Sequence, residues 1–301
     1  MTPEHRAQLS LDGLSVGDAF GARFFGATET VVPKIDARQL PLDPWLYTDD
    51  TEMAISVVEV LESIDEIDQD LLVRRFAARM NDMRGYGGGT YRLLCAVQEG
   101  GAWRRLSAAG FRGVGSFGNG AAMRVAPLGA YFADRALEHI IEQARLSAEV
   151  THMHAEGIAG AVAVAVAAAL AWQRREQSAA LGSAWLEAVR DATPAGATRG
   201  GIQRALELDE RTTVLEAAEA LGNGFEVSAA DTVPLCLWVA SRQSHDFSAA
   251  LWETVRALGD RDTTCAIVGG IVALHAGPEG IPATWLERRE TLPARLRLTT
   301  R

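Results

Sequence analysis

Apolar residues recur along this chain at the three- and four-residue spacing of amphipathic helices. The segment 51–64 places seven apolar side chains on one broad face: Met53, Ile55, Val57, Val58, Val60, Leu61 and Ile64. Similar patterns occur in segments 70–80, 136–150, 183–192, 213–221, 232–241 and 247–258. The period-2 alternation of half-buried strands is not evident. The pattern predicts an all-α protein.

Two further segments are apolar on every side. The segment 158–172 is mostly Ala and Val, and it is shorter than the roughly 20 residues that a membrane-spanning helix needs. We therefore expect a closely packed core helix and no membrane partner. The segment 263–277 has the composition of a buried helix that tolerates glycine.

Glycine clusters separate the predicted helices and indicate loops at 85–90, 113–122, 196–201 and 222–224. No segment has the composition of a linker, and no repeat of fixed period is visible. We therefore expect a single compact multi-helix domain that spans residues 1–301.

The composition narrows the class of protein. Apolar residues make up 48% of the 301 residues, and the net charge is −10, a balance typical of a soluble protein and unlike that of a general nucleic-acid-binding protein. Cys95, Cys236 and Cys265 lie far apart, so no disulfide framework or zinc pair is indicated. The N-terminus lacks a basic region followed by an apolar stretch. We expect a cytoplasmic monomer.

An acidic cluster lies directly before the apolar pattern that begins at Met53. It consists of Thr48, Asp49, Asp50 and Thr51. Asp and Thr are favoured at helix N-caps, and carboxylates interact well with the helix dipole. Capping by Asp49 or Asp50 is therefore one interpretation.

A second cluster repeats this chemistry more than 200 residues later, where Asp260 and Asp262 are followed by Thr263 at the start of the buried segment 263–277. Capping accounts for one aspartate in each cluster but not for the second. Carboxylates and hydroxyls are the ligands that hard divalent cations prefer. The residues alone leave capping and a metal site both open.

The glycine-rich segment 113–124 could hold phosphate groups with its backbone N–H groups, or it could simply form a tight turn. It follows no predicted strand and lacks a Walker signature, so no nucleotide-binding fingerprint is indicated. His152 and His154 precede the Ala/Val helix. They could pack at its start or contact a ligand, but zinc is not indicated because no Cys or acidic partner has the usual spacing.

Eight segments, in this order, resemble the ADP-ribosylglycohydrolase family, whose best-known bacterial member reactivates dinitrogenase reductase. They are GLSVGDAFGA (13–22), YTDDTEMAI (47–55), GYGGGTYRLL (85–94), GSFGNGAAMRVAPLG (115–129), THMHAEGIAGAVAVA (151–165), LGNGFEVSAADTVPLCLW (221–238), LGDRDTTCAIVGGIVALHAG (258–277) and IPATWLERRE (281–290). Each segment is weakly specific, but their order along most of the chain is highly specific.

The resemblance implies an all-α hydrolase with two Mg²⁺ or Mn²⁺ ions, acting on an ADP-ribosylated protein or an ADP-ribose conjugate. It implies that Asp50 or Asp262 accepts a proton from the attacking water. The implied metal ligands are Thr48, Asp49, Asp50, Asp260, Asp262 and Thr263. The implied ADP-ribose contacts are Gly115, Ser116, Phe117, Gly118, Asn119, Gly120 and His152, with Phe117 or Phe225 against the adenine. We expect arginine as the acceptor, with serine-linked ADP-ribose and O-acetyl-ADP-ribose as alternatives.

One position departs from the family pattern. The family usually carries a glutamate eight residues after the first glycine of its GDA-x-G segment, and that position is Phe25 when counted from Gly17. Glu29 is the nearest following acid. Because phenylalanine can neither bind a metal nor act as a base, a second hypothesis is a protein that binds ADP-ribose without turning it over.

Overall fold

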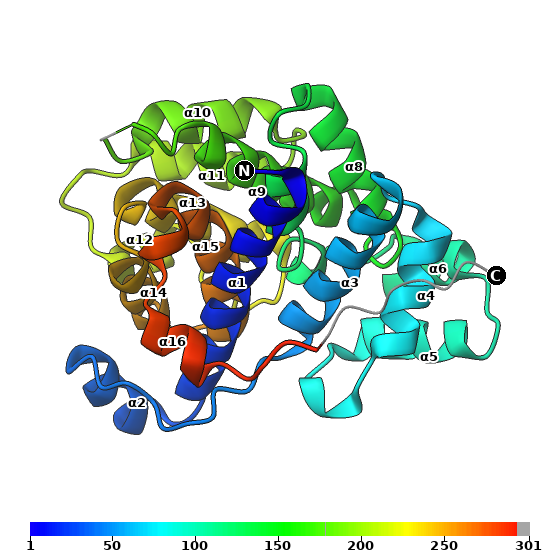
Figure 1. Cartoon of the computed structure of the whole chain (residues 1–301), viewed down its shortest axis with the longest axis horizontal. Coiled ribbons are helices and arrows are strands. Elements are labelled where there is room, and N and C mark those ends of the chain that lie inside the picture. The colour runs from blue at the N-terminus through cyan, green and yellow to red at the C-terminus, as the bar shows by residue number, and fades with distance from the viewer. Residues whose placement is uncertain (178, 294–301) are drawn as a thin grey trace.

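The computed structural model describes residues 1–177 and 179–293. Within these residues the chain forms helices joined by loops, with two isolated β-bridges and no named strand (Figure 1). The α-helices are α1 Pro3–Gly21, α2 Thr28–Asp36, α3 Asp49–Ile64, α4 Gln69–Arg79, α5 Gly88–Gln98, α6 Trp103–Gly113, α7 Ala126–Tyr131, α8 Leu137–Glu149, α9 Ala155–Gln173, α10 Gly182–Ala192, α11 Ala197–Glu207, α12 Val214–Leu221, α13 Ala229–Gln243, α14 Phe247–Arg256, α15 Arg261–Ala276 and α16 Ala283–Arg288. Short 3₁₀ turns are η1 Ala22–Phe24, η2 Asp82–Arg84, η3 Asn119–Ala121 and η4 Pro278–Gly280. The prediction of an all-α fold is confirmed.

The Ala/Val-rich helix α9 lies in the core, as its composition predicts. It packs against α7, α8, α13 and α15. In the described part of the chain it is the one helix long and apolar enough to cross a membrane, but 78% of that apolar window is buried inside the protein. Small side chains let its neighbours approach closely: a Cβ on Gly160 would lie 2.6 Å from the Ala229 Cβ.

Helices α1 and α15 run antiparallel in close contact, and three glycines four residues apart on α1 make this possible. A Cβ on Gly17 would lie 2.1 Å from the Cys265 carbonyl oxygen, and one on Gly21 would lie 2.1 Å from the Arg261 carbonyl oxygen. Gly13 faces Gly269 in the same way. Helix α3 packs on the other side of α1 (Figure 1). The C-terminal end of α1 therefore lies beside the first turns of α3 and α15.

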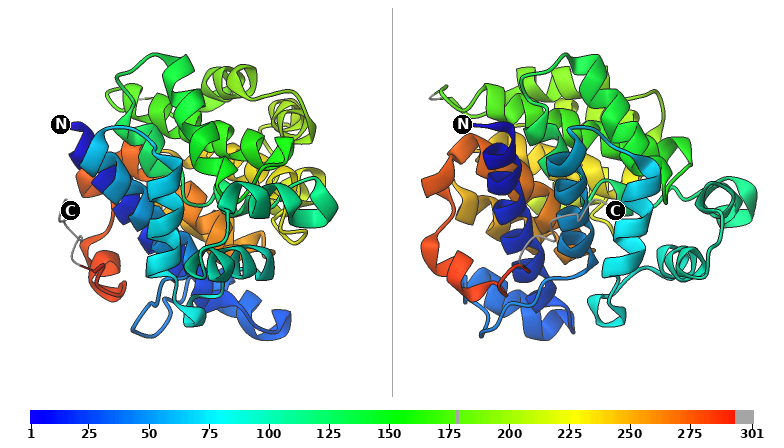
Figure 2. Two further views of the ribbon diagram at one scale, coloured as in Figure 1. Left: turned by 90° about the vertical axis from the view of Figure 1, so that its right-hand side faces the viewer. Right: turned by 45° about the vertical axis from the view of Figure 1, so that its right-hand side comes forward.

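The loop that leads into α3 is held in place by aromatic packing and by the C-terminal segment. The Trp45 side chain is fully buried, and its ring contacts Phe20 of α1 and Trp285 of α16. The Trp45 backbone N–H donates to the Arg288 carbonyl, and the Glu290 N–H donates to the Trp45 carbonyl. Helices α4 to α6, coloured from cyan to blue-green, continue from α3 along one flank of the molecule (Figure 2). These contacts fix where α3 begins.

The glycine cluster at 196–201, for which the sequence predicts a loop, lies largely inside α11, so that prediction is wrong. The Glu156 carboxylate accepts hydrogen bonds from the Ala197 and Thr198 N–H groups and satisfies the start of this helix. A Cβ on Gly201 would lie 2.4 Å from Pro234 Cγ. The glycine serves a close contact between α11 and α13.

Candidate metal centre

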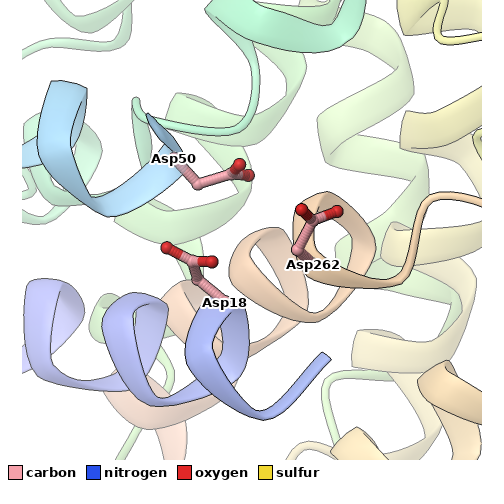
Figure 3. Close-up of side chains that lie close together, drawn as sticks. All are labelled: Asp18, Asp50 and Asp262. Atoms are coloured by element: carbon pink, nitrogen blue, oxygen red, sulfur yellow. The ribbon is translucent and has the colours of Figure 1, made fainter. Parts of the chain in front are cut away.

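Three aspartates from three different helices direct their carboxylates into one small volume (Figure 3). Asp18 lies near the end of α1, Asp50 in the first turn of α3 and Asp262 in the first turn of α15. One ligand oxygen from each lies within 4.8 Å of the other two. The structure thus brings together the two acidic segments that the sequence separates by more than 200 residues.

Asp18 is a member of this cluster that the sequence reasoning missed. Its carboxylate accepts hydrogen bonds from the Thr48 N–H at 2.9 Å, the Thr48 hydroxyl at 2.8 Å, the Thr51 N–H at 3.1 Å and the Thr51 hydroxyl at 2.5 Å. The available signal was its place in GLSVGDAFGA, where a lone carboxylate is surrounded by small and apolar residues. An acid with such neighbours is buried and needs a partner.

Asp18 also explains why the capping interpretation of Asp49 and Asp50 is wrong. Helix α3 begins at Asp49, its N-cap is Thr48, and the Thr48 side chain accepts no hydrogen bond from a backbone N–H of the helix. The free N–H of Thr51 in the first turn is satisfied by Asp18 instead. Because a side chain from α1 takes the capping role, the carboxylates of Asp49 and Asp50 remain available for another purpose.

The carboxylates of this centre lack cationic partners in the described part of the chain. Asp50 Oδ2 lies 3.0 Å from the Thr48 hydroxyl, whereas Asp50 Oδ1 is buried without a hydrogen-bond partner. Across residues 1–177 and 179–293, no Arg, Lys or His forms an ion pair with Asp18, Asp49, Asp50, Asp260 or Asp262. Buried carboxylates require a compensating cation or a proton. The donor set fits hard divalent cations.

The carboxylates show the electrostatic strain expected of such a cluster. Burial raises the pKa of Asp18 to about 6 and, together with the Asp18 charge, raises the pKa of Asp49 to about 7. Burial and the neighbouring aspartates hold the pKa values of Asp50 and Asp262 well above the ordinary range. A bound cation would oppose these increases by favouring the ionised carboxylates.

The remaining implied metal ligands surround this cluster. Asn119 donates from its side-chain nitrogen to Asp260 Oδ2 at 2.7 Å and to the Thr232 hydroxyl at 3.1 Å. The buried Asn119 amide is thus engaged in orienting Asp260. The Thr263 N–H donates to Asp262 Oδ1 at 2.9 Å.

A cleft of about 600 Å³ opens directly above the carboxylates. The implied metal ligands that line it are Asp49, Asp50, Asp260, Asp262 and Thr263. The implied ADP-ribose contacts that line it are Ser116, Phe117, Gly118, Asn119, Gly120 and His152. Gly115 instead packs behind the loop, where a Cβ would lie 2.7 Å from the His154 backbone nitrogen. An adjoining hollow of about 420 Å³ shares Gly89, Thr90, Phe111 and Ser116 with the cleft.

Within the glycine-rich loop, few backbone N–H groups are available to an anion. The N–H groups of Gly115, Gly118 and Asn119 donate to other protein atoms. The N–H groups of Ser116, Phe117 and Gly120 have no acceptor among the described residues. These three N–H groups are the ones in the loop that remain available to phosphate oxygens.

The structure distinguishes between the two aromatic residues expected to contact adenine. Phe117 lines the cleft, and its ring centroid lies 5.1 Å from that of Phe111, which the sequence reasoning did not single out. Phe225 is 79% exposed and lines a separate hollow beside α12. The arrangement favours Phe117, with Phe111 as its neighbour.

Phe25 lies outside the cleft lining, on the side where α1 meets α15. It is 49% exposed, and its ring centroid lies 5.3 Å from the Arg261 guanidinium. Arg261 also donates to the Phe24 carbonyl at 2.7 Å. Glu29 is exposed in the first turn of α2 and does not line the cleft. In place of the glutamate that the family pattern implies at position 25, the chain has a phenylalanine whose ring packs against the Arg261 guanidinium.

The fold and the centre define a helical protein with an acidic, metal-type site beneath a cleft. The ADP-ribosylglycohydrolase family profile matches residues 1–300, so the chain belongs to that family. ADP-ribosylhydrolase ARH3 from Bos taurus is 30% identical, with 93% of this chain and 87% of that protein covered. An uncharacterized protein from Archaeoglobus fulgidus is 32% identical, with 94% and 91% covered.

A solved structure described as an ADP-ribosylglycohydrolase-related protein complex has the same fold. Its TM-score is 0.66 at 25% identity, with 96% of this chain and 93% of that chain covered. The named relative above is an ARH3 protein. The resemblance to the bacterial enzyme that reactivates dinitrogenase reductase therefore extends to membership of the same family and no further.

Proposed function

We propose that this protein is a metal-dependent hydrolase that releases ADP-ribose from a modified side chain or a small conjugate. The observation that carries this proposal is the convergence of Asp18, Asp50 and Asp262 beneath the cleft, with one buried oxygen of Asp50 unpartnered. Membership of a family of ADP-ribosylglycohydrolases supports the choice of substrate.

The residues that would hold two Mg²⁺ or Mn²⁺ ions are Asp18, Thr48, Asp49, Asp50, Asp260, Asp262 and Thr263. Such ions, when bound, polarise ribose hydroxyls and lower the pKa of a bound water. Asp50 or Asp262 would accept the proton of that water. Asn119 keeps the Asp260 carboxylate oriented through its 2.7 Å hydrogen bond.

The rest of the cleft would bind the non-reacting part of ADP-ribose. The Ser116 and Phe117 N–H groups would donate to the diphosphate, and the Phe111 and Phe117 rings would contact the adenine. Binding energy from these remote groups orients the reacting ribose over the carboxylates.

A substrate panel tests this proposal and addresses the acceptor. The purified protein should be incubated with Mg²⁺ or Mn²⁺ and with arginine-linked, serine-linked and O-acetyl-linked ADP-ribose, and the released ADP-ribose should be measured. We expect turnover of the arginine-linked compound that chelation abolishes. Metal-independent turnover would exclude the proposed mechanism.

Phe25 supports a second candidate, a protein that binds ADP-ribose without hydrolysing its conjugates. An exposed aromatic ring stands where a carboxylate is expected. Tight ADP-ribose binding by calorimetry, combined with no turnover of any compound in the panel, would establish this candidate over the hydrolase.

A further inference from the structure

Arg124 is a fully buried cation close to the cleft, and it has no acidic partner in the described part of the chain. Its guanidinium donates to the Gly120 carbonyl, the Ser147 carbonyl and the Thr151 hydroxyl, each at 2.9 Å. Its charge is also 4.6 Å from the centre of the Phe76 ring. Burying a charge that bonds only to neutral groups costs free energy. The buried Arg124 guanidinium therefore calls for a functional explanation.

The bond to Thr151 fixes where the single proton of the Thr151 hydroxyl can go. A guanidinium can only donate, so Thr151 Oγ1 accepts from Arg124. The same oxygen lies 2.7 Å from His152 Nδ1. No other acceptor for this buried hydroxyl is present among residues 1–177 and 179–293. The arrangement that gives this hydroxyl proton an acceptor within the protein is the one in which Thr151 donates to a His152 Nδ1 that carries no proton.

His152 is also held neutral. Burial and the neighbouring Arg124 charge lower the pKa of His152 to about 3. A neutral imidazole without a proton on Nδ1 carries its proton on Nε2. The Nε2 atom bonds to no described residue, and it lies 3.3 Å and 3.0 Å from the positions that a Cβ on Gly118 and on Gly120 would take. The N–H group is thus directed at the glycine-rich side of the cleft.

We propose that Arg124, acting through the Thr151 hydroxyl, sets the tautomer of His152 so that this histidine presents a neutral N–H donor to an acceptor oxygen of the ligand. Arg124 and Thr151 are positioning residues in this arrangement. The identity of the ligand oxygen, a phosphate or ribose oxygen of ADP-ribose, rests on the proposed function. The other tautomer would direct a lone pair at that oxygen and repel it.

The tautomer can be measured directly in the metal-loaded full-length protein. Nitrogen resonances of ¹⁵N-histidine-labelled protein separate protonated from unprotonated ring nitrogens, and the His152 signals can be assigned by their loss in His152→Gln. We expect an unprotonated Nδ1 and a protonated Nε2 at neutral pH. A proton on Nδ1 in the wild-type protein would overturn the proposal, with no variant required.

Two variants of Thr151 test the relay and its purpose. Thr151→Val removes the hydroxyl with little change in volume, and Thr151→Ser restores it. We expect Thr151→Val to populate the Nδ1–H form and to bind ADP-ribose about ten-fold more weakly, whereas Thr151→Ser stays within about two-fold of wild type. An unchanged tautomer in Thr151→Val would refute the relay.

The proposed function and this inference can fail separately. If wild-type protein shows an unprotonated His152 Nδ1 but binds no ADP-ribose, the ligand assignment is wrong and the tautomer assignment stands. If ADP-ribose binds and Thr151→Val binds it as tightly as wild type, the proposed function survives and the positioning role is refuted.

Discussion

Asp18 on α1 caps α3 by accepting hydrogen bonds from both the backbone N–H and the hydroxyl of Thr51, at 3.1 Å and 2.5 Å. Helix α1 is itself held against α15 by its glycines. The start of α3 is therefore placed relative to the start of α15 through a single carboxylate. Capping of α3 and the proposed metal centre therefore share one carboxylate. Because Asp18 of α1 caps α3, Asp49 and Asp50 are not needed as caps and remain available to a metal ion.

Replacing Asp18 by Asn should separate these two roles. The amide keeps one acceptor oxygen and the volume of the side chain, but it removes the charge and brings donors toward Thr48 and Thr51. We expect Mg²⁺ or Mn²⁺ affinity, measured by calorimetry, to fall by about 10- to 100-fold. Asp12→Asn on the same helix is the control and should bind metal as wild type does. Unchanged affinity in Asp18→Asn would remove Asp18 from the metal centre.

Metal addition should stabilise the protein more at neutral than at acidic pH. The folded-state pKa values of Asp18 and Asp49 are raised to about 6 and about 7. Folded metal-free protein therefore binds more protons than unfolded chain between about pH 4 and pH 7, and its free energy of unfolding falls as pH rises through that window. Because cations compete with those protons, the Mn²⁺-induced rise in Tm should be larger at about pH 7.5 than at about pH 5.5.

Thermal unfolding with and without Mn²⁺ at the two pH values checks this expectation. Asp50→Asn serves as the comparison, since it removes one carboxylate and should reduce both the rise in Tm and its dependence on pH. An equal rise at both pH values in wild-type protein would show that these carboxylates do not hold the metal.

Phe25→Glu tests whether the absence of a glutamate at position 25 limits catalysis. The new carboxylate would lie near the Arg261 guanidinium and the first turn of α15. If the carboxylate is the missing component, kcat for arginine-linked ADP-ribose should rise by about ten-fold or more. Phe25→Gln, which matches the size without the charge, should not rise. No change or a fall in Phe25→Glu would indicate that this segment has been adapted to another purpose.

The aromatic pair beside the glycine-rich loop should contribute to ADP-ribose affinity. Stacking of a base on an aromatic ring is worth about 1–3 kcal/mol, so Phe117→Ala should weaken binding by about five- to 150-fold in calorimetry. Phe225→Ala removes a more exposed ring from a separate hollow and should leave the Kd unchanged. The reverse ranking of the two variants would place the adenine beside α12.

Close packing of α1 against α15 should make Gly17 intolerant of a methyl group. A Cβ there would lie 2.1 Å from a backbone carbonyl oxygen, and relief of that overlap costs about 1–3 kcal/mol. Gly17→Ala should therefore lower the Tm measured by circular dichroism. Gly200→Ala in α11 is the matched control, because its Cβ would meet nothing closer than 3.9 Å and Ala is the better helix former. Equal Tm values for the two variants would contradict the contact.

Helical periodicity was a reliable guide where helices are long and amphipathic, as for α3, α8 and α14. It fails for α11, because glycines clustered at 196–201 predict a loop whereas the structure places most of them inside the helix. Their roles depend on partners elsewhere, namely Glu156 at the helix start and Pro234 facing Gly201. Local pattern cannot report a contact with a residue that is distant in sequence.

Periodicity and motifs were enough to predict that the chain is all helical, that its two acidic segments carry ligands suited to hard cations, and that its ordered motifs belong to one family. It could not show that Asp18 completes the cluster, because burial of a lone aspartate becomes meaningful only when α1, α3 and α15 meet. Tertiary structure also decided that Asn119 orients Asp260 and that Arg124 reaches His152 through Thr151. These roles depend on distances of about 3 Å between residues brought together by folding, and such distances follow from packing rather than from periodicity.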